Sequence, residues 1–447
     1  MIKISVIGLG KLGACSAACF AAKGFEVIGV DLNNNFVDDI NKGKAPVHEP
    51  RLQELITYAG DRLKATQDYD TAINGSDVTF LIVPTPSRED GNFSNDYLLS
   101  ALENLAAALK KSGKAYHLFV ITSTVSPGAT DEILIPLIER VSGRKLKQGF
   151  GVCYNPEFIA LGSVITNFLN PDMLLIGESS EYAGEILQRI YEKVCENKPY
   201  FARMSIISAE ITKISLNSYV TMKISYANTL ANICEKIPGA DVDDISKALG
   251  ADKRISPYYL KGGLGYGGPC FPRDNRAFAV FAAKYGVDAK LARATDEVNG
   301  FQVKHLVDLV LDHISAANDG IVSVLGLAYK PNTPVIEESP GIKLVEELLK
   351  RNLKVMVYDE LAAANTKVIF GDRIIYSASV KDCLSKSSVC IVTTMTDEFR
   401  KIDDSYITND PTVVIDCWRI LDPSRLGAKV KYISVGRFDY EHCTACA

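Results

Sequence analysis

The chain has 447 residues, of which 47% are hydrophobic and 23% are charged, and its formal net charge is −5. This length and balance are typical of a globular protein with two or three domains, and they exclude a disordered chain. No run of Lys and Arg is long enough to follow a phosphate backbone, so we expect no nucleic-acid partner. No apolar run approaches the roughly 20 residues of a membrane span, so we expect no membrane partner.

The first residues and the cysteines indicate a cytoplasmic protein. The sequence MIKISVIGLG begins a strand at once, which leaves no room for a signal peptide. The 11 cysteines show no disulfide-framework spacing, so we expect reduced thiols. Cys443 and Cys446 form one CxxC pair without a second pair, so we expect neither a zinc site nor any other metal.

The beginning of the chain predicts a strand, a glycine turn and a helix. Residues 2–7 are an apolar, β-type run, GLGKLG follows at 8–13, and small residues continue as a helix to Gly24. A second strand is predicted over 25–30, directly before Asp31. This order is that of the first unit of a dinucleotide-binding sheet.

Each residue of this motif has a physical role in binding a dinucleotide. Gly8 makes the tight turn, Gly10 lets a pyrophosphate approach the helix N-terminus, and Gly13 allows close helix packing. The Asp31 carboxylate would bond ribose hydroxyls and repel a 2′-phosphate, so we expect NAD rather than NADP. The alternative interpretation is a glycine turn that binds no ligand.

Later strands of the first sheet also end in polar or turn-forming residues. A strand over 78–83 leads into Thr85 and Pro86, and a strand over 118–122 leads into Thr124. Ligands of open parallel sheets bind beyond these carboxyl ends. Glu157, after another predicted strand, is either a general base or a solvated turn residue, and the local sequence leaves both interpretations open.

A long helix is predicted from about Ser205 to Lys236. Ser208 is the expected cap and Glu210 is expected in the first turn. Lys213 and Asn217 are four residues apart and therefore share a face, where they would hold a substrate hydroxyl and stabilise charge on its oxygen. The alternative is a solvent-facing polar stripe. The apolar flanks of this helix favour a central strut and a subunit interface.

A glycine-rich run over 262–268 leads to Cys270. Its backbone is expected to fold closely around a ligand, because glycines leave little side-chain obstruction. Pro272 is suited to the first turn of a helix and Gly286 to its end, which places Cys270 near a helix N-terminus. The helix dipole and Arg273 would favour a nucleophilic thiolate there. The alternative is a small buried cysteine that only fills space.

A second α/β unit follows the helical segment. A strand over 321–325 leads through GLAYKPNT into a helix that ends near Arg351, and a strand over 354–358 ends in Asp359. Further strands are predicted over 389–393 and 413–415. The predicted fold is therefore α/β, with two Rossmann-like, doubly wound parallel sheets joined by a long central helix and a helical segment.

The ordered motifs of the chain resemble those of the UDP-glucose/GDP-mannose dehydrogenase family. They are GLGKLG with Asp31, KGKAPVHEPRL at 42–52, TSTVSPG at 122–128, NPEF at 155–158, SAEITKISLN at 208–217, GYGGPCFPRD at 265–274 and GLAYKPNT at 326–333. The resemblance implies oxidation of the C6 alcohol of a nucleotide sugar to a carboxylate, with two NAD and a cysteine thioester. It implies an NAD-binding domain over 1–203, a central helical dimerisation domain over 204–314 and a nucleotide-sugar-binding domain over 315–447.

The resemblance, together with the interpretations above, gives three sets of candidate residues. The catalytic set is Cys270, Lys213, Asn217, Asp274, Glu157 and Thr124. The cofactor-binding set is Gly8, Gly10, Leu12, Gly13, Asp31, Thr85, Pro86, Thr124 and Arg273. The substrate-binding set is Glu157, Phe158, Lys213, Asn217, Arg254, Tyr259, Lys261, Gly267, Lys330 and Arg419. The resemblance also implies a homodimer in which Arg254 reaches the partner's substrate site.

Several positions depart from the pattern of the family. They are Leu161 in place of a second glutamate, Pro269 before the cysteine, Arg273 in place of a lysine, Pro84 before Thr85, and Pro334, Val335 and Glu337 in place of two aspartates and an arginine. These changes leave the residues of the core chemistry intact. They bear on the identity of the sugar, the strength of NAD binding and the rate.

Three functions are compatible with the sequence. We favour a four-electron nucleotide-sugar 6-dehydrogenase that makes a polysaccharide precursor, most like the UDP-glucose type. The same chemistry on GDP-mannose, UDP-galactose or a UDP-N-acetylhexosamine is an alternative. A two-electron β-hydroxyacid-type dehydrogenase would have no use for Cys270, and a non-catalytic nucleotide-sugar-binding protein would have no need of a nucleophile.

Overall fold

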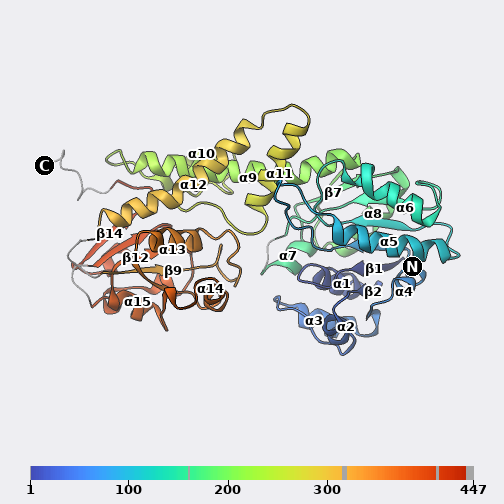
Figure 1. The fold of residues 1–447 in the computed structure, drawn as a ribbon, viewed down its shortest axis with the longest axis horizontal. Coiled ribbons are helices and arrows are strands. Elements are labelled where there is room, and N and C mark those ends of the chain that lie inside the picture. The colour runs from blue at the N-terminus through green and yellow to red at the C-terminus, as the bar shows by residue number, and fades with distance from the viewer. Residues whose placement is uncertain (1, 160–161, 315–319, 409–411, 439–447) are drawn as a thin grey trace. The chain divides into compact units, whose positions relative to one another are not determined.

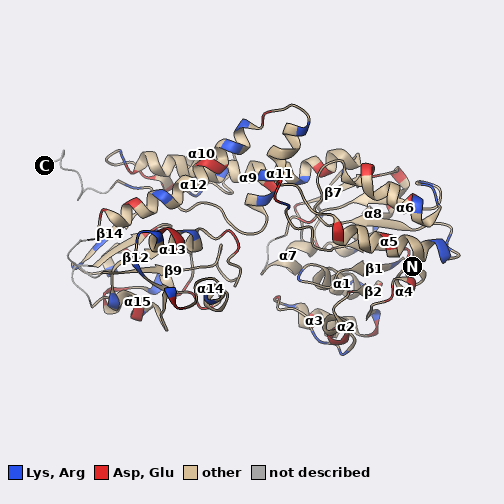
Figure 2. Cartoon of the chain, viewed as in Figure 1, with Lys and Arg blue, Asp and Glu red and all other residues tan. Residues whose placement is uncertain are grey.

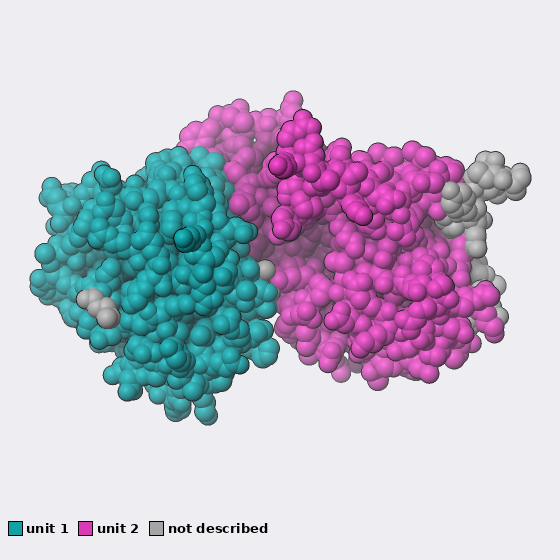
Figure 3. Space-filling model, turned by 180° about the vertical axis from the view of Figure 1, so that it is seen from behind, with its two compact units in different colours: residues 1–214 teal, residues 215–447 magenta. Residues whose placement is uncertain are grey.

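The computed structural model describes residues 2–159, 162–314, 320–408 and 412–438. The chain forms two compact units, residues 1–214 and 215–447, which Figure 3 shows in different colours. Leu161, Cys443 and Cys446, on which some of the predictions fall, lie outside the described residues.

The first unit contains an eight-stranded sheet with the order β3-β2-β1-β4-β5-β6-β7-β8. Its strands are β1 (Lys3–Ile7), β2 (Glu26–Val30), β3 (Leu63–Thr66), β4 (Val78–Leu81), β5 (Leu118–Ile121), β6 (Gly151–Tyr154), β7 (Met173–Glu178) and β8 (Tyr200–Met204). Neighbouring strands are parallel except β6 and β7, which pair antiparallel with Cys153 opposite Glu178. The sheet is therefore doubly wound as predicted, with one reversed pair that the sequence pattern did not indicate.

Helices cover both faces of this sheet because its strands bury alternate residues on opposite sides (Figure 1). In β5, Leu118 and Val120 join one core while Phe119 and Ile121 join the other. The first core includes α1 (Gly13–Ala22), α3 (Leu52–Ala59), α7 (Val164–Leu169) and α8 (Glu181–Val194), and the second includes α4 (Tyr69–Gly75), α5 (Asp96–Lys111) and α6 (Ile135–Ser142). Helix α2 (Asn34–Asn41) follows β2.

The second unit contains a six-stranded sheet with the order β11-β10-β9-β12-β13-β14 and parallel pairing throughout. Its strands are β9 (Ile321–Leu325), β10 (Lys354–Tyr358), β11 (Ile375–Tyr376), β12 (Ser387–Val392), β13 (Thr412–Asp416) and β14 (Val430–Ser434). One face packs against α12 (Lys290–Leu311) and α13 (Pro340–Lys350), and the other against α15 (Val380–Lys386). Helices α10 (Val242–Ala251), α11 (Phe271–Lys284) and α14 (Ala363–Phe370) complete this unit.

The long helix α9 (Ile206–Cys234) begins close to the predicted start at about Ser205, but its cap is not the predicted one. The side chain of Ser205, and not that of Ser208, caps it by accepting a hydrogen bond from the Ser208 N–H at 3.4 Å. Glu210 consequently lies in the second turn, where its buried carboxylate accepts the N–H groups of Gly128 at 2.6 Å and Thr130 at 3.0 Å. The predicted cap was wrong because two serines three residues apart satisfy the same capping pattern.

Charged residues of both signs are interspersed along the helices of each unit (Figure 2). In the part of the chain that the structure describes, no helix combines the length and apolar character that crossing a bilayer requires.

Candidate functional site

The glycines of the turn after β1 differ in how much space surrounds them. Gly8 has φ +92°, and a methyl group there would lie 2.4 Å from the Ile82 carbonyl oxygen. A methyl group at Gly13 would lie 1.8 Å from the Gly8 carbonyl oxygen, whereas one at Gly10 would meet nothing within 4 Å. Gly8 and Gly13 are therefore required by the fold, and Gly10 leaves open space beside the start of α1. Leu12 occupies the N-cap of α1 without a side-chain hydrogen bond to the helix.

Asp31 lies at the carboxyl end of β2, beside this turn. Its carboxylate accepts the N–H of Leu9 at 2.6 Å and that of Asn33 at 2.8 Å. These bonds fix the half-buried carboxylate next to the open space at Gly10. The open turn, the helix start without a side-chain cap and the carboxylate together fit a dinucleotide, with the pyrophosphate at α1 and the ribose hydroxyls at Asp31.

The loops after β4 and β5 lie side by side. The Thr85 hydroxyl donates to the Thr124 carbonyl oxygen at 2.7 Å. Ser123, which the sequence analysis did not single out, accepts the Val83 N–H at 3.0 Å and donates to the Val83 carbonyl oxygen at 2.7 Å. Pro86 accepts the N–H of a serine farther along its loop, Ser94, at 2.7 Å. Thr85, Pro86 and Thr124 are thus held at the carboxyl edge of the sheet, where cofactors bind.

Glu157 follows β6 on a loop that Asn155 anchors. The buried Asn155 amide donates to the Leu175 carbonyl oxygen at 2.9 Å and accepts the Tyr191 hydroxyl at 2.6 Å. Glu157 is half-buried, and loss of solvation raises the pKa of its carboxyl to about 7, against the opposing effect of Lys213. A carboxyl with this pKa exists in both protonation states near neutral pH, as a general base requires.

Lys213 on α9 completes the polar group around Glu157. Its side chain is buried, and its Nζ lies 4.7 Å from the centroid of the Phe158 ring. A cationic side chain at this distance from an aromatic ring gains cation–π attraction. Asn217 is also buried and lies four residues later on the same helix.

Glu49 is a further residue of this region that the sequence analysis did not select. Its carboxylate accepts the Gly162 N–H at 3.1 Å and the Val164 N–H at 2.8 Å. It thereby ties the chain that follows Glu157 to the segment KGKAPVHEPRL. The available signal was that motif itself, which contains Glu49 but does not show its partner.

In the second unit, Cys270 is the N-cap residue of α11 and its side chain is exposed. This confirms the predicted location at a helix N-terminus. Asp274, in the first turn of α11, is fully buried, and its carboxylate accepts the Asn217 amide at 2.6 Å and the Arg273 Nε at 3.1 Å. The structure thus brings together Asn217, Asp274 and Arg273 beside the helix that Cys270 begins.

The glycines before Cys270 are required by close packing within the protein. The sequence analysis expected them instead to let the loop fold around a ligand. Methyl groups there would lie 2.5 Å from the Ala227 carbonyl oxygen (at Gly262), 2.5 Å from that of Cys417 (at Gly263), 2.4 Å from Asn299 Oδ1 (at Gly265), 2.4 Å from the Glu338 carbonyl oxygen (at Gly267) and 2.6 Å from the Tyr329 ring (at Gly268). The loop passes between α9, α12 and two turns of the second sheet, with no room for a side chain at these five glycines.

Tyr329 lies beside Cys270 and was not among the predicted site residues. Burial and the neighbouring Cys270 thiol raise the pKa of Tyr329 to about 12. The Nζ of Lys330 lies 5.6 Å from the centroid of the Tyr329 ring. The motif GLAYKPNT contained Tyr329, but only the contact with Gly268 shows that its ring lies against the cysteine loop.

The remaining predicted substrate residues of the second unit are mostly exposed. Arg254 pairs with Asp252 through Nη2 and Oδ2 at 2.6 Å, with 86% of its side chain exposed. The Tyr259 ring is centred 6.1 Å from that of Phe271, next to Cys270. The Lys261 Nζ lies 3.8 Å from Met395 Sδ, and burial lowers the pKa of Lys261.

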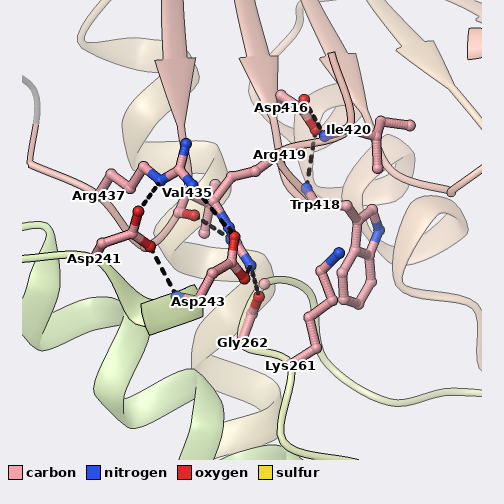
Figure 4. A network of polar contacts seen from close by, with 12 residues as sticks. Asp241, Asp243, Lys261, Gly262, Asp416, Trp418, Arg419, Ile420, Val435 and Arg437 are labelled. Carbon is pink, nitrogen blue, oxygen red and sulfur yellow. Dashed lines mark hydrogen bonds and ion pairs between the residues drawn. The ribbon is translucent and has the colours of Figure 1, made fainter. Parts of the chain in front are cut away.

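Arg419 is the exception, because its side chain is only 1% exposed. Its guanidinium donates to both Asp243 carboxylate oxygens at 2.7 and 2.8 Å, to the Gly262 carbonyl oxygen at 2.8 Å and to the Val435 carbonyl oxygen (Figure 4). All three of its nitrogens bond to protein atoms. A contact between Arg419 and the substrate therefore stays a prediction. To make it, the guanidinium would have to leave its ion pair with Asp243.

Within residues 2–159, 162–314, 320–408 and 412–438, no three or more His, Cys, Asp or Glu side chains are grouped so that they could hold a metal ion. The first unit carries the dinucleotide turn, the Lys213 ammonium and the Glu157 carboxyl. The second unit carries an exposed thiol at a helix start, with a buried amide and a buried carboxylate beside that helix. Together with the doubly wound sheet, these features define a nicotinamide-dependent dehydrogenase.

The comparisons with known proteins agree with this class and name the family. Three models of the UDP-glucose/GDP-mannose dehydrogenase family match the chain: the NAD binding domain over residues 2–195, the central domain over 207–300 and the UDP binding domain over 323–423. The chain belongs to this family, and it is an NAD-dependent nucleotide-sugar dehydrogenase.

Individual relatives match over most of their length. The chain is 38% identical over 424 residues to the UDP-glucose 6-dehydrogenase AglM of Haloferax volcanii, covering 94% of this chain and 97% of that protein. It is 36% identical over 363 residues to the GDP-mannose 6-dehydrogenase of Pseudomonas putida, covering 80% and 81%. A UDP-glucose dehydrogenase structure from Pyrobaculum islandicum matches with a TM-score of 0.89 at 30% identity, covering 98% of each chain.

Proposed function

We propose that this chain oxidises the C6 alcohol of UDP-glucose to the carboxylate of UDP-glucuronate, using two NAD. The observation that carries the proposal is the pairing at α11: Cys270 begins the helix with an exposed side chain, and Asp274 in its first turn holds the Asn217 amide at 2.6 Å. A nucleophile and an amide that can stabilise an oxyanion are thereby fixed on adjoining elements. The relative from Haloferax volcanii supports the choice of sugar.

In the first oxidation, the C6 alcohol loses a proton and a hydride to become an aldehyde. NAD supplies the hydride acceptor, both here and in the second oxidation. The Lys213 ammonium and the Asn217 amide stabilise the negative charge on the oxygen. A water near Thr124 and Asp274 takes the proton, and Asp274 keeps the amide of Asn217 in place.

In the second oxidation, the Cys270 thiolate adds to the aldehyde carbon and forms a thiohemiacetal. Loss of hydride from that carbon gives a thioester on Cys270. Water then attacks the thioester carbonyl, Glu157 removes a proton from this water, and the cysteine leaves as the thiolate. The pKa of Glu157, about 7, suits this role.

We also propose a cytoplasmic homodimer in which Arg254 enters the substrate site of the partner. The exposed position of Arg254 supports this proposal, as does the concentration of exposed large apolar side chains on α9 to α12 and their loops: Tyr219, Tyr226, Ile233, Ile237, Ile245, Ile255, Tyr258, Tyr285, Val287, Leu291, Phe301 and Leu311. Such apolar surface is typical of an interface between subunits. The division into domains at residues 203 and 314, and a role in polysaccharide precursor synthesis, belong to the same proposal.

GDP-mannose is the second candidate substrate, because the GDP-mannose 6-dehydrogenase of Pseudomonas putida is 36% identical to this chain. The departures at Pro269 and Glu337 do not discriminate between these sugars.

The test is NADH formation by the purified protein with UDP-glucose, GDP-mannose, UDP-galactose and UDP-N-acetylglucosamine as separate substrates. We expect UDP-glucose to give the highest kcat/KM. A preference for another sugar would reassign the substrate. Absence of NADH with every sugar, while calorimetry still detects UDP-glucose binding, would indicate a binding protein and contradict the proposal.

A further inference from the structure

Two asparagine side chains hold the glycine-rich loop that precedes Cys270. On α9, the fully buried Asn228 accepts the Gly263 N–H at 2.8 Å and donates to the Leu264 carbonyl oxygen at 3.2 Å. On α12, Asn299 accepts the Tyr266 N–H at 2.7 Å and donates to the Tyr266 carbonyl oxygen at 3.1 Å. Each amide thus satisfies both a donor and an acceptor of the loop backbone.

Open space borders the loop beside Asn299. Gly265 and Tyr266 line a pocket of about 440 Å³ together with Asn299 and Gly300. On this side Gly265 borders open space and has no side chain of its own with which to anchor the loop. A methyl group at Gly265 would lie 2.4 Å from Asn299 Oδ1, which shows how closely the amide draws the loop to α12.

A second contact from α12 reaches the same residue. The Tyr266 hydroxyl donates to the Asp296 carboxylate, and Asp296 lies three residues before Asn299 on one face of the helix. Burial raises the pKa of Tyr266 well above its usual value, so the hydroxyl remains a donor at neutral pH. Helix α12 therefore holds Tyr266 by its backbone and by its side chain.

The residues between Tyr266 and Cys270 leave little freedom to absorb a displacement. The Gly268 N–H donates to the Glu337 carbonyl oxygen at 3.0 Å. Gly267 and Gly268 lie against the Glu338 carbonyl oxygen and the Tyr329 ring, where no methyl group would fit. We therefore expect a shift of Tyr266 to reach Cys270 and the start of α11.

We propose that Asn299 is a positioning residue for Cys270, with Asn228 as the second clamp of the same loop. The proposal rests on the proposed function, in which the thiol takes part only in the second oxidation. Loss of the Asn299 clamp should therefore slow the second oxidation and spare the first. A residue that only stabilises the fold would affect both oxidations alike.

The experiment compares wild type, Asn299→Ala and Lys304→Ala, in which Lys304 is an exposed residue of the same helix and pocket. Each protein receives UDP-glucose and NAD with hydroxylamine present to trap free aldehyde. For Asn299→Ala we expect a second oxidation about 10- to 100-fold slower, trapped aldehyde, and fewer than two NADH per sugar. Lys304→Ala should behave as wild type. Equal losses in both oxidations, or an unchanged stoichiometry, would overturn the proposal.

A second readout does not depend on turnover. Alkylation of Cys270 by iodoacetamide, followed by peptide mass spectrometry, should be about fivefold slower or more in Asn299→Ala, because the thiolate leaves the helix start that favours it. If wild type oxidises no sugar, the proposed function fails, and this rate alone decides the role of Asn299. An alkylation rate equal to that of wild type would then overturn the proposal.

If Asn299→Ala does not fold, the alkylation experiment uses Asn299→Asp in its place. Its protonated carboxyl offers one donor and one acceptor as the amide does, whereas its carboxylate faces the Tyr266 carbonyl oxygen with no donor. The alkylation rate relative to wild type should therefore recover as the pH falls. A ratio that does not change with pH would contradict the clamp.

Discussion

The side-chain amide of Asn217 donates to the Asp274 carboxylate at 2.6 Å, and Asp274 is fully buried. This bond joins α9 to α11, the helix that Cys270 begins. Because Arg273 bonds to the same carboxylate at 3.1 Å, the charge of Asp274 is paired and its position is fixed.

Replacing Asp274 by Ala should leave the Asn217 amide and the Arg273 guanidinium without their shared acceptor. We expect the free energy of unfolding to fall by about 3 kcal/mol, as is usual when one partner of a buried pair is removed. Urea denaturation measures this change, and Asp61→Ala, at an exposed position, is the control. A loss no larger than that of the control would show that the buried carboxylate does not stabilise the fold.

Glu157 predicts a specific pH dependence. Its pKa of about 7 means that the carboxylate needed as a base forms as the pH rises through 7. Thioester hydrolysis should therefore accelerate across this range and then level off. In Glu157→Gln the thioester should accumulate on Cys270, where intact-protein mass spectrometry detects it. A variant that hydrolyses the thioester at the wild-type rate would exclude Glu157 as the base.

The same pKa has a consequence for stability. The pKa of Glu157 is raised from 4.5, so its neutral form is the one the fold favours. This contribution is fully present below pH 4.5 and is lost as the pH rises through 7. Wild type should therefore lose unfolding free energy relative to Glu157→Gln between these values, as chemical denaturation at several pH values would show. A constant difference would contradict the desolvation of Glu157.

Gly10 and Gly13 form a matched pair of substitutions. A methyl group at Gly13 would lie 1.8 Å from the Gly8 carbonyl oxygen, so Gly13→Ala should lower Tm strongly. A methyl group at Gly10 meets nothing within 4 Å, so Gly10→Ala should keep the wild-type Tm but bind NAD about tenfold more weakly, because it fills the space for the pyrophosphate. Differential scanning calorimetry and NAD titration test the pair. Wild-type NAD affinity in Gly10→Ala would contradict the placement of the cofactor.

We predict that Arg419 stabilises the fold mainly through its ion pair with Asp243. Arg419→Met removes the two-point partner of the Asp243 carboxylate, which then keeps only Arg437 at 3.4 Å, and a donor to the Gly262 carbonyl oxygen. We expect a loss of about 3 kcal/mol in unfolding free energy. The double variant with Asp243→Ala should lose much less than the sum of the single losses, since both remove one ion pair. Additive losses would show that the two residues act independently.

The sequence predicted the elements whose signals are local. The glycine turn over 8–13, Asp31 at the end of β2 and the helix start at Cys270 all follow from spacings within about 20 residues. The reversed strands β7 and β8 and the edge strand β14 were not predicted, because orientation and edge pairing depend on distant partners. The cap of α9 was assigned to Ser208 since local sequence did not distinguish it from Ser205.

The clamps were not predictable for the same reason. Asn228 and Asn299 are single amides in helices, and such residues have the appearance of ordinary polar positions. Their loop partners Gly263 and Tyr266 lie 35 and 33 residues away in the chain. Only the folded arrangement shows that both amides serve the loop of Cys270.

The most direct test of the account counts NADH formed per UDP-glucose consumed, for wild type and Cys270→Ser. We predict two NADH per sugar and release of the uronic acid for wild type. Cys270→Ser should fail to release the uronic acid at the wild-type rate. One NADH per sugar in wild type, or uronic acid released by Cys270→Ser at the wild-type rate, would contradict the four-electron mechanism through Cys270.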